Sequence, residues 1–192
     1  MEPTEDTRAA AGGAAPRGAA SGSGRGCGAL LGAETLPCHA LSANLGTVML
    51  RVFFSAQVVA AFTIDSPSPR KPGLVVQDWL SHGLSVEIIA PEPVTEEDFG
   101  LAHDPVHVRE ILSLEKDNGF FTRDQVVADS LFYTTGAMVA AAMHAVQSGT
   151  CACAPVSGFH HAMYRSIGAF CTFNGLLVAA QQLGREAVAP LD

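Results

Sequence analysis

The stretch that decides how this chain folds spans residues 154–174 and reads APVSGFHHAMYRSIGAFCTFN. Two adjacent histidines, His160 and His161, stand near its start. The apolar run 151–156 is typical of a short buried strand, and the apolar run 173–183 is typical of a helix. The histidine pair therefore lies on a loop between a strand and a helix. In open α/β sheets ligands bind at this loop edge, and imidazoles placed there can transfer protons near neutral pH.

A second interpretation gives the pair no chemical role. Single histidines are usually surface residues or hydrogen-bonded core residues, and short motifs also occur by chance. The spacing of the two histidines leaves both interpretations open, so the residues around them have to decide.

Residues 157–162, SGFHHA, and residues 169–174, AFCTFN, resemble the signature of the histone deacetylase family. That family carries a glycine, an aromatic residue, two histidines and an alanine, followed by Gly-Phe-Cys-x-x-Asn. Ala169 is the one departure, because the family usually has glycine at this position. A weaker resemblance runs upstream through the His-Asp-Pro of residues 103–105, and the whole covers roughly residues 50–192.

The composition indicates one folded domain. The 192 residues are 48% hydrophobic and 16% charged, which suits a globular α/β protein and excludes a wholly disordered one. The net charge of −8 argues against non-specific nucleic-acid binding. No uninterrupted apolar run reaches the length that spans a bilayer. The sequence therefore predicts neither nucleic acid nor a membrane as a partner.

The five cysteines argue against a disulfide framework, because their number is odd. Cys151 and Cys153 alternate on the expected strand, so both would face one side of the sheet. A Cys-x-Cys pair can bind metal, yet two small buried hydrophobic side chains are the simpler explanation. These features favour a reducing, cytoplasmic location.

The chain divides into two parts by composition. Residues 1–48 are rich in alanine and glycine and have little to bury, so we expect a disordered extension there. Residues 49–192 carry alternating strand and helix patterns. The expected strands are 49–54, 85–90, 151–155 and 187–191, and the expected longer helices are 75–80, 126–148 and 173–183, the last ending at Gly184.

Two short helices are expected between these elements. Thr95 with Asp98 resembles a capping box, and Asp104 before Pro105 is a typical N-cap and first helical residue. His103 precedes that cap while His107, four positions later, follows it, so the two need not share a helical face. A structural role is favoured for both of these histidines over a shared ligand.

The order of elements indicates an α/β fold with a mainly parallel sheet, right-handed crossovers and helices on both faces. The resemblance implies an arginase–deacetylase-like three-layer α/β/α fold. Residues 49–192 would form its N-terminal portion, so the domain would be incomplete. The Pro- and Ser-rich loop 66–72 is atypical, because the family often has His-Pro-Glu in this region.

The resemblance also implies a zinc-dependent hydrolase that removes acetyl groups from lysine side chains, polyamines or similar amides. In that family Zn²⁺ is bound by an Asp-x-His pair and a later aspartate. None of these ligands is expected in this chain, which would be truncated before them. No metal ligand is therefore assigned, and the chain as given is expected to be inactive alone.

The resemblance gives individual residues their roles. His161 would act as general base and then as general acid, and His160 would stabilise the developing negative charge. Asp192 would orient His160 through a carboxylate hydrogen bond. The residues expected to bind substrate are Gly158, Phe159 and Phe170, the last as a wall against the methylene stem of an acyl-lysine.

Three interpretations stay open on the sequence. The first is a zinc deacetylase of which this chain is a truncated part, and the second is a catalytically inactive half-domain that acts as a binding module. The third is an unrelated α/β domain with an accidental signature. An in-frame Asp-x-His-His-Gly segment encoded beyond residue 192 would favour the first. The sequence fixes neither the substrate, beyond an acetylated amine, nor the oligomeric state.

Overall fold

The computed structural model of this chain describes residues 49–61 and 66–188. All of these residues belong to one compact unit. The disordered extension expected over residues 1–48 lies outside the described residues.

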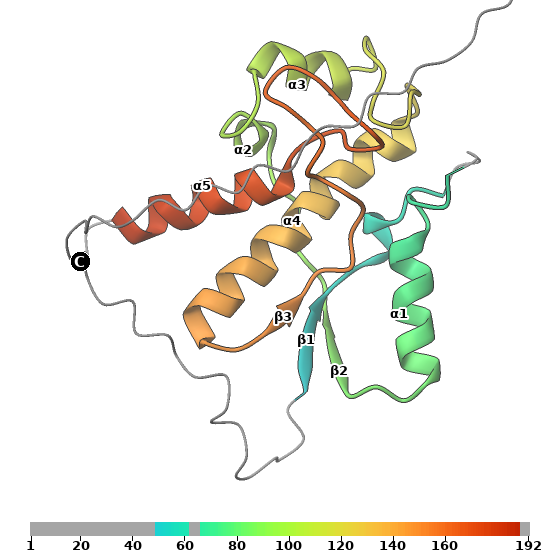
Figure 1. The fold of residues 1–192 in the computed structure, drawn as a ribbon, viewed down its shortest axis with the longest axis vertical. Helices are drawn as coiled ribbons and strands as arrows, with labels where there is room; N and C mark the ends of the chain where they lie inside the picture. Colours follow the sequence, from blue (N-terminus) through green and yellow to red (C-terminus); the bar gives the residue numbers. More distant parts are fainter. Residues whose placement is uncertain (1–48, 62–65, 189–192) are drawn as a thin grey trace, which may run out of the picture. The chain divides into compact units, whose positions relative to one another are not determined.

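Three parallel strands form a sheet in the order β2-β1-β3 (Figure 1). On the central strand, Val52 lies opposite Ile88 on one side and opposite Cys153 on the other. Parallel pairing follows from the helices that connect the strands, because a parallel pair needs a long crossover. The strands are β1 (Leu50–Phe53), β2 (Val86–Ile89) and β3 (Ala152–Cys153). The parallel α/β architecture predicted from the sequence is confirmed.

Strand β3 is shorter than the strand predicted at 151–155. Only Ala152 and Cys153 pair with β1. Pro155 has no N–H to donate to a sheet ladder, which helps to end the pairing before it. Cys151 precedes the strand and is exposed, whereas Cys153 is half-buried. The two cysteines are therefore not equivalent positions of one strand face.

The longest element is helix α4 (Gln125–Ser148), which has a defined cap at each end. At its start, the Asp124 carboxylate accepts a hydrogen bond of 2.8 Å from Val126 N. At its end, Gly149 adopts a left-handed conformation with φ of 65°, which glycine tolerates without a steric cost. The helix predicted over 126–148 is thus confirmed within one residue.

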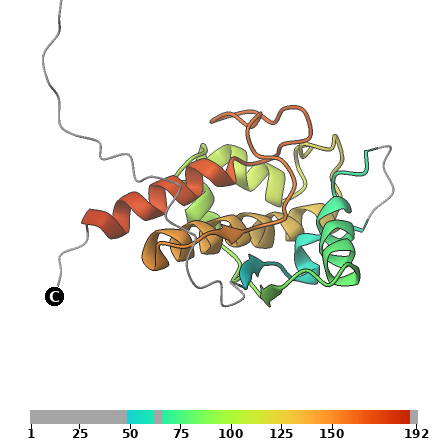
Figure 2. The same cartoon turned by 60° about the horizontal axis from the view of Figure 1, so that its bottom comes forward.

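Small side chains allow α4 to approach the sheet, on which it packs against β1 and β3 (Figure 2). Ala137 and Ala141 are buried in one cluster with Phe53 and Val58. By length and composition α4 is apolar enough to cross a membrane, contrary to the expectation from the sequence. Its packing against the sheet is equally typical of the core helix of a globular domain.

Of the remaining short elements, two begin at the caps expected from the sequence, Thr95 and Asp104. Thr95 N donates to Asp98 Oδ2 at 2.7 Å, and Asp98 N donates to Thr95 Oγ1 at 3.3 Å, which completes a capping box. Asp104 accepts from Val106 N at 2.8 Å. The remaining short elements are the 3-10 helix η1 (Ala56–Val58) and the helices α1 (Lys71–Ser81), α2 (Glu96–Phe99) and α3 (Pro105–Leu112).

The main core lies between α2, α3, α4 and α5 (Gly175–Val188). Phe99 and Phe173 are almost completely buried there, with ring centroids 4.5 Å apart. Burying one such side chain stabilises the fold by about 1.5–3 kcal/mol. Because Phe173 belongs to the segment 154–174, this core also holds the end of that segment in place.

Helix α5 corrects two sequence expectations. The helix continues through Gly184, which was expected to end it, and includes Ala187, which was expected to begin a fourth strand. A Cβ at Gly184 would meet nothing within 4 Å, and its φ is not positive. Glycine inside an exposed helix costs only about 1 kcal/mol relative to alanine, and residues 184–187 are exposed, so this cost does not end the helix. Residues 189–192 lie outside the described residues.

Candidate active site

The signature segment (residues 154–174) leaves β3, runs along α4 and folds back beside α3 before α5 begins (Figures 1 and 2). It makes two tight turns. Met163 N donates to Ser166 O at 2.9 Å in the first turn. Gly168 and Cys171 exchange backbone hydrogen bonds of 3.0 and 2.7 Å in the second. The loop between a strand and a helix that the sequence predicts is confirmed.

His160 and His161 precede the first of these turns, and both side chains are exposed. Their ring centroids lie 3.9 Å apart, with the ring planes at 45°. Ala162 N donates to Phe159 O at 3.2 Å, so a backbone turn carries the pair. Within residues 49–61 and 66–188 neither ring has a hydrogen-bond partner, so both imidazoles face solvent. Asp192, the expected partner of His160, lies outside the described residues, and its role stays a prediction.

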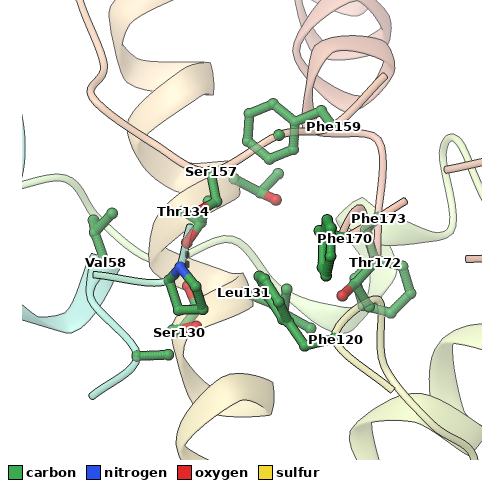
Figure 3. A pocket seen from close by; sticks show the side chains of 14 residues that line it. Val58, Phe120, Ser130, Leu131, Thr134, Ser157, Phe159, Phe170, Thr172 and Phe173 are labelled. Atoms are coloured by element: carbon green, nitrogen blue, oxygen red, sulfur yellow. Dashed lines mark hydrogen bonds between the residues drawn. The ribbon is translucent and has the colours of Figure 1, made fainter. Parts of the chain in front are cut away.

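An apolar pocket adjoins the residues directly before the histidine pair (Figure 3). Its walls come from α4, from the signature segment and from two loops. On the α4 side it carries hydroxyl groups, of which Thr134 Oγ1 donates to Ser130 O at 2.7 Å. The three residues expected to bind substrate all line this pocket, namely Gly158, Phe159 and Phe170. The structure therefore brings them together, while their contact with substrate stays a prediction.

Phe159 is fixed in the pocket wall by the first residue of α5. Its side chain is 7% exposed, and a Cβ on Gly175 would lie 2.7 Å from its ring. Only glycine permits this close approach. The backbone next to His160 is thereby packed against the start of a helix.

Ala169 and Phe170 form the tip of the second tight turn. Their φ angles are +41° and +68°, and a turn with two positive central φ angles is of the primed type that closes hairpins. Left-handed backbone costs an L-residue roughly 1–2 kcal/mol, and glycine escapes this cost. The departure noted at Ala169 is therefore a strained position. This turn carries the Phe170 ring, which is 42% exposed and lines the pocket.

Phe121 is a candidate residue that no sequence pattern indicated. Its side chain is 65% exposed and its φ is +60°, so a bulky aromatic residue is held in a left-handed conformation at the surface. Its ring centroid lies 6.4 Å from that of Phe170 at an interplanar angle of 75°. The centroid of Phe120 lies 6.1 Å from Phe170. Three phenyl rings from two loops therefore meet beside the pocket.

The loop that carries Phe120 and Phe121 is attached to the signature segment. Gly119 N donates to Thr172 Oγ1 at 2.9 Å. A Cβ on Gly119 would lie 2.6 Å from the carbonyl carbon of Cys171, so any larger residue would push the two loops apart. The aromatic group at the pocket mouth is thus held by direct backbone contact between the loops.

His103 and His107 lie in the interior, as a structural role requires. His103 is fully buried, and its ring centroid is 6.3 Å from that of His107. Burial lowers the pKa of both imidazoles, and in His107 the nearby Lys116 ammonium lowers the pKa further. His107 Nδ1 lies 3.2 Å from Lys116 Nζ, while its buried Nε2 has no hydrogen-bond partner. The ring centroids of His103 and His107 lie 5.2 and 6.1 Å from that of Phe173.

The described residues do not fit a metal site. No group of three His, Cys, Asp or Glu side chains within residues 49–61 and 66–188 could bind a metal ion. His160 and His161 alone provide two nitrogen ligands, whereas catalytic zinc sites use three protein ligands. No chemical step through a metal follows from these residues.

The loop that follows β3 of this parallel sheet carries an exposed histidine pair beside an apolar pocket, at the edge where α/β proteins bind ligands. The model of the histone deacetylase domain matches residues 68–192. The chain belongs to the histone deacetylase family, whose members are deacetylase hydrolases. Comparison with curated proteins finds no match to this sequence.

The crystal structure of the HDA15 HD domain has a similar fold, with a TM-score of 0.61 and 19% sequence identity. The match covers 73% of this chain and 44% of that chain. This chain therefore spans less than half of the solved domain it matches. The likeness supports the fold, and the partial coverage agrees with a domain that is incomplete within these residues.

Proposed function

We propose that this chain provides the histidine pair of a deacetylase that hydrolyses the amide bond of an acetylated amine. The observation that carries the proposal is the exposed pair of His160 and His161, placed directly after residues that line an aromatic pocket. Membership of the histone deacetylase family supports the reaction class. Two adjacent imidazoles at a loop edge are suited to moving a proton near neutral pH.

In this proposal His161 transfers the proton. One of its ring nitrogens accepts a proton from the attacking water as the water oxygen bonds to the acetyl carbon. The same nitrogen donates that proton to the amine nitrogen as the C–N bond breaks, which releases acetate and the free amine. His160 keeps its proton, and its positive charge stabilises the oxygen anion formed between the two steps.

The acetylated amine would lie against the aromatic group at the pocket mouth. The exposed faces of Phe170 and Phe121 offer apolar area to a methylene stem, while the amide reaches toward the histidines. Acetyl-lysine in a protein and acetylpolyamines both present such a stem, and smaller acetyl amides present the amide alone. All three remain candidates for the substrate.

We keep zinc as the proposed cofactor, with its ligands outside the described residues. The family supports zinc, whereas the described residues do not fit a zinc site by themselves. The match to 44% of the HDA15 HD domain is consistent with ligands that lie in sequence this chain does not contain. Residues 49–188 alone would then have no activity.

The cysteines support a reducing setting for this activity. Cys151, Cys153 and Cys171 are free. Burial raises the pKa of the Cys153 thiol, which keeps it protonated and unreactive. The cytoplasm therefore remains the proposed location.

A binding module without turnover is the alternative, and the lack of a metal group among the described residues favours it. The test begins with the nucleotide sequence beyond codon 192 and with expression of the longest open reading frame. Acetate release from an acetyl-lysine peptide in the presence of zinc, lost in a His160→Ala/His161→Ala variant, would support the deacetylase. Tight binding of that peptide without acetate release would support the binding module instead.

A further inference from the structure

His103 lies shortly before α3 and is bonded to both ends of the second half of the signature segment, residues 163–174. The ring is fully buried. His103 Nδ1 lies 2.9 Å from Met163 O, and Asn174 N lies 2.7 Å from His103 Nε2. Met163 begins the first of the two turns, and Asn174 lies directly before the first residue of α5. One imidazole therefore closes the loop that follows the histidine pair.

The two partners fix which ring nitrogen carries the proton. A backbone N–H can only donate, so Nε2 of His103 must be the unprotonated acceptor for Asn174 N. A carbonyl oxygen can only accept, so Nδ1 must donate to Met163 O. A second proton on the ring would break the bond to Asn174. Burial lowers the pKa of His103, which agrees with a neutral ring.

Neighbouring contacts hold the same loop against the same helix. Asp104 N donates to Tyr164 O at 3.0 Å, and the Arg165 guanidinium forms an ion pair with Asp104 Oδ2 at 2.7 Å. The start of α3 is thus bonded to three consecutive residues of the signature segment, 163–165. The bond between Asn174 N and His103 is buried, so water cannot substitute for a lost partner there.

The anchored loop is also bonded to the residue that directly follows the histidine pair. Asn174 Nδ2 donates to Ala162 O at 3.4 Å, and Ala162 follows His161 in sequence. The backbone that carries His160 and His161 therefore has packed residues on both sides: Phe159 against Gly175 before it, and Ala162 with Met163 after it.

We propose that His103, as a neutral ring protonated at Nδ1, is a positioning residue that sets the orientation of His160 and His161. It touches neither the pair nor the pocket, and acts through the backbone at Met163 and Asn174. The inference depends on the proposed function only for the task that the pair performs. The hydrogen-bonded placement itself can be tested without any enzymatic activity.

Three variants separate the two bonds of His103. His103→Phe keeps an aromatic ring against Phe173 and removes both bonds. His103→Gln places an amide oxygen near the position of Nε2, so it can accept only from Asn174 N. His103→Asn places an amide nitrogen near the position of Nδ1, so it can donate only to Met163 O. His82→Phe is the matched control, because His82 lies at the exposed end of α1.

Nuclear magnetic resonance of the intact chain supplies the readouts. In the wild-type protein, ¹⁵N shifts should show His103 protonated at Nδ1 and unprotonated at Nε2. Hydrogen exchange at the Asn174 amide should be at least about tenfold faster in His103→Phe and His103→Asn, and near wild type in His103→Gln. The ring signals of His160 and His161 should shift in His103→Phe and stay unchanged in His82→Phe.

The opposite results overturn the proposal in distinguishable ways. A wild-type ring protonated at Nε2, which requires no variant to fold, would contradict the placement. Unchanged ring signals of His160 and His161, despite faster exchange at Asn174, would reduce His103 to a structural residue.

If the signals shift as expected and the longer, zinc-loaded protein still releases no acetate, the deacetylase proposal fails while the positioning role stands. If that protein is active, His103→Phe should lower kcat at least about tenfold with little change in KM, with partial recovery in His103→Gln.

Discussion

Two pairs of histidines lie at opposite extremes of exposure in this protein. His103 and His107 are buried, and His103 has both ring nitrogens bonded to backbone. His160 and His161 are exposed, and their rings lie 3.9 Å apart. His103 is bonded to both ends of the loop 163–174, and the exposed pair lies shortly before that loop in the sequence. The same side chain therefore acts through hydrogen-bond geometry in the interior, whereas at the surface it is accessible for the proton transfer that we propose.

Removing the second exposed histidine should give the largest effect on activity. In the active, longer protein, His161→Ala should lower kcat for an acetyl-lysine peptide by about 10²- to 10⁴-fold, because general acid–base catalysis contributes that much. His160→Ala should cost less, since the role proposed for His160 is electrostatic. Because both side chains are exposed, neither change should alter the midpoint of urea unfolding. Normal turnover of the His161→Ala variant would contradict the proposed mechanism.

Removing the aromatic ring that packs against both buried histidines should give the largest effect on stability. Phe173 is 1% exposed, so Phe173→Ala should lower the free energy of unfolding by about 3–5 kcal/mol. Met163→Ala, in a side chain that is 69% exposed, should change it by no more than about 0.5 kcal/mol. Urea denaturation followed by circular dichroism measures both. Equal effects for the two variants would show that the end of the signature segment is not packed as described.

The buried histidines should make stability depend on pH in a defined direction. Burial lowers the pKa of His103 and of His107 below the ordinary value of 6.5. Between the lowered value and 6.5 the unfolded chain binds more protons than the folded chain. The free energy of unfolding should therefore be highest above pH 6.5 and decrease as the pH falls below it.

Urea denaturation measures this dependence when it is repeated at intervals from about pH 7.5 to about pH 5, a range that brackets the ordinary histidine pKa of about 6.5. His103→Gln should flatten the curve, and His82→Gln, at an exposed position, should leave it unchanged. A curve that stays level below pH 6.5 in the wild-type protein would contradict the buried, neutral state of the two rings.

The smallest expected effect concerns the strained turn beside the exposed pair. Ala169→Gly should raise the free energy of unfolding by up to about 1 kcal/mol, because the relief of a positive φ exceeds the greater chain entropy of glycine. The midpoint of thermal unfolding should rise accordingly. Gly168→Ala is the opposite change, since a Cβ there would lie 2.8 Å from His161 O, and it should destabilise the protein. A loss of stability in Ala169→Gly would contradict the strain at this turn.

The elements that local interactions determine could be predicted from the sequence. The capping box at Thr95, the cap at Asp104 and the end of α4 at Gly149 were all expected, because each depends on residues within one helical turn. The placement of the histidine pair on a loop between β3 and α5 followed from the apolar runs on either side. The family followed from the residues around the pair.

The contacts that join distant residues could not be predicted. His103 and Asn174 are 71 positions apart, and no pattern in the sequence indicates their hydrogen bond. The ring of Phe121 meets Phe170 only because Gly119 allows two loops to touch. Helix α5 passes through Gly184 because one glycine costs a helix only about 1 kcal/mol, so its position does not reveal where the helix ends. The partner expected for His160, Asp192, lies outside the described residues.

The pairing of β1 with β3 has a consequence for how the protein is made. Arg51 of β1 pairs with Ala152 of β3, at a sequence separation of roughly one hundred residues, and pairings between distant segments form slowly. During synthesis β1 leaves the ribosome long before β3 has been made, so one side of β1 has no strand to pair with during that interval. Helix α4 can form locally in that interval. We therefore expect the order of assembly to run from helix to sheet, and the loop with the histidine pair to become ordered last.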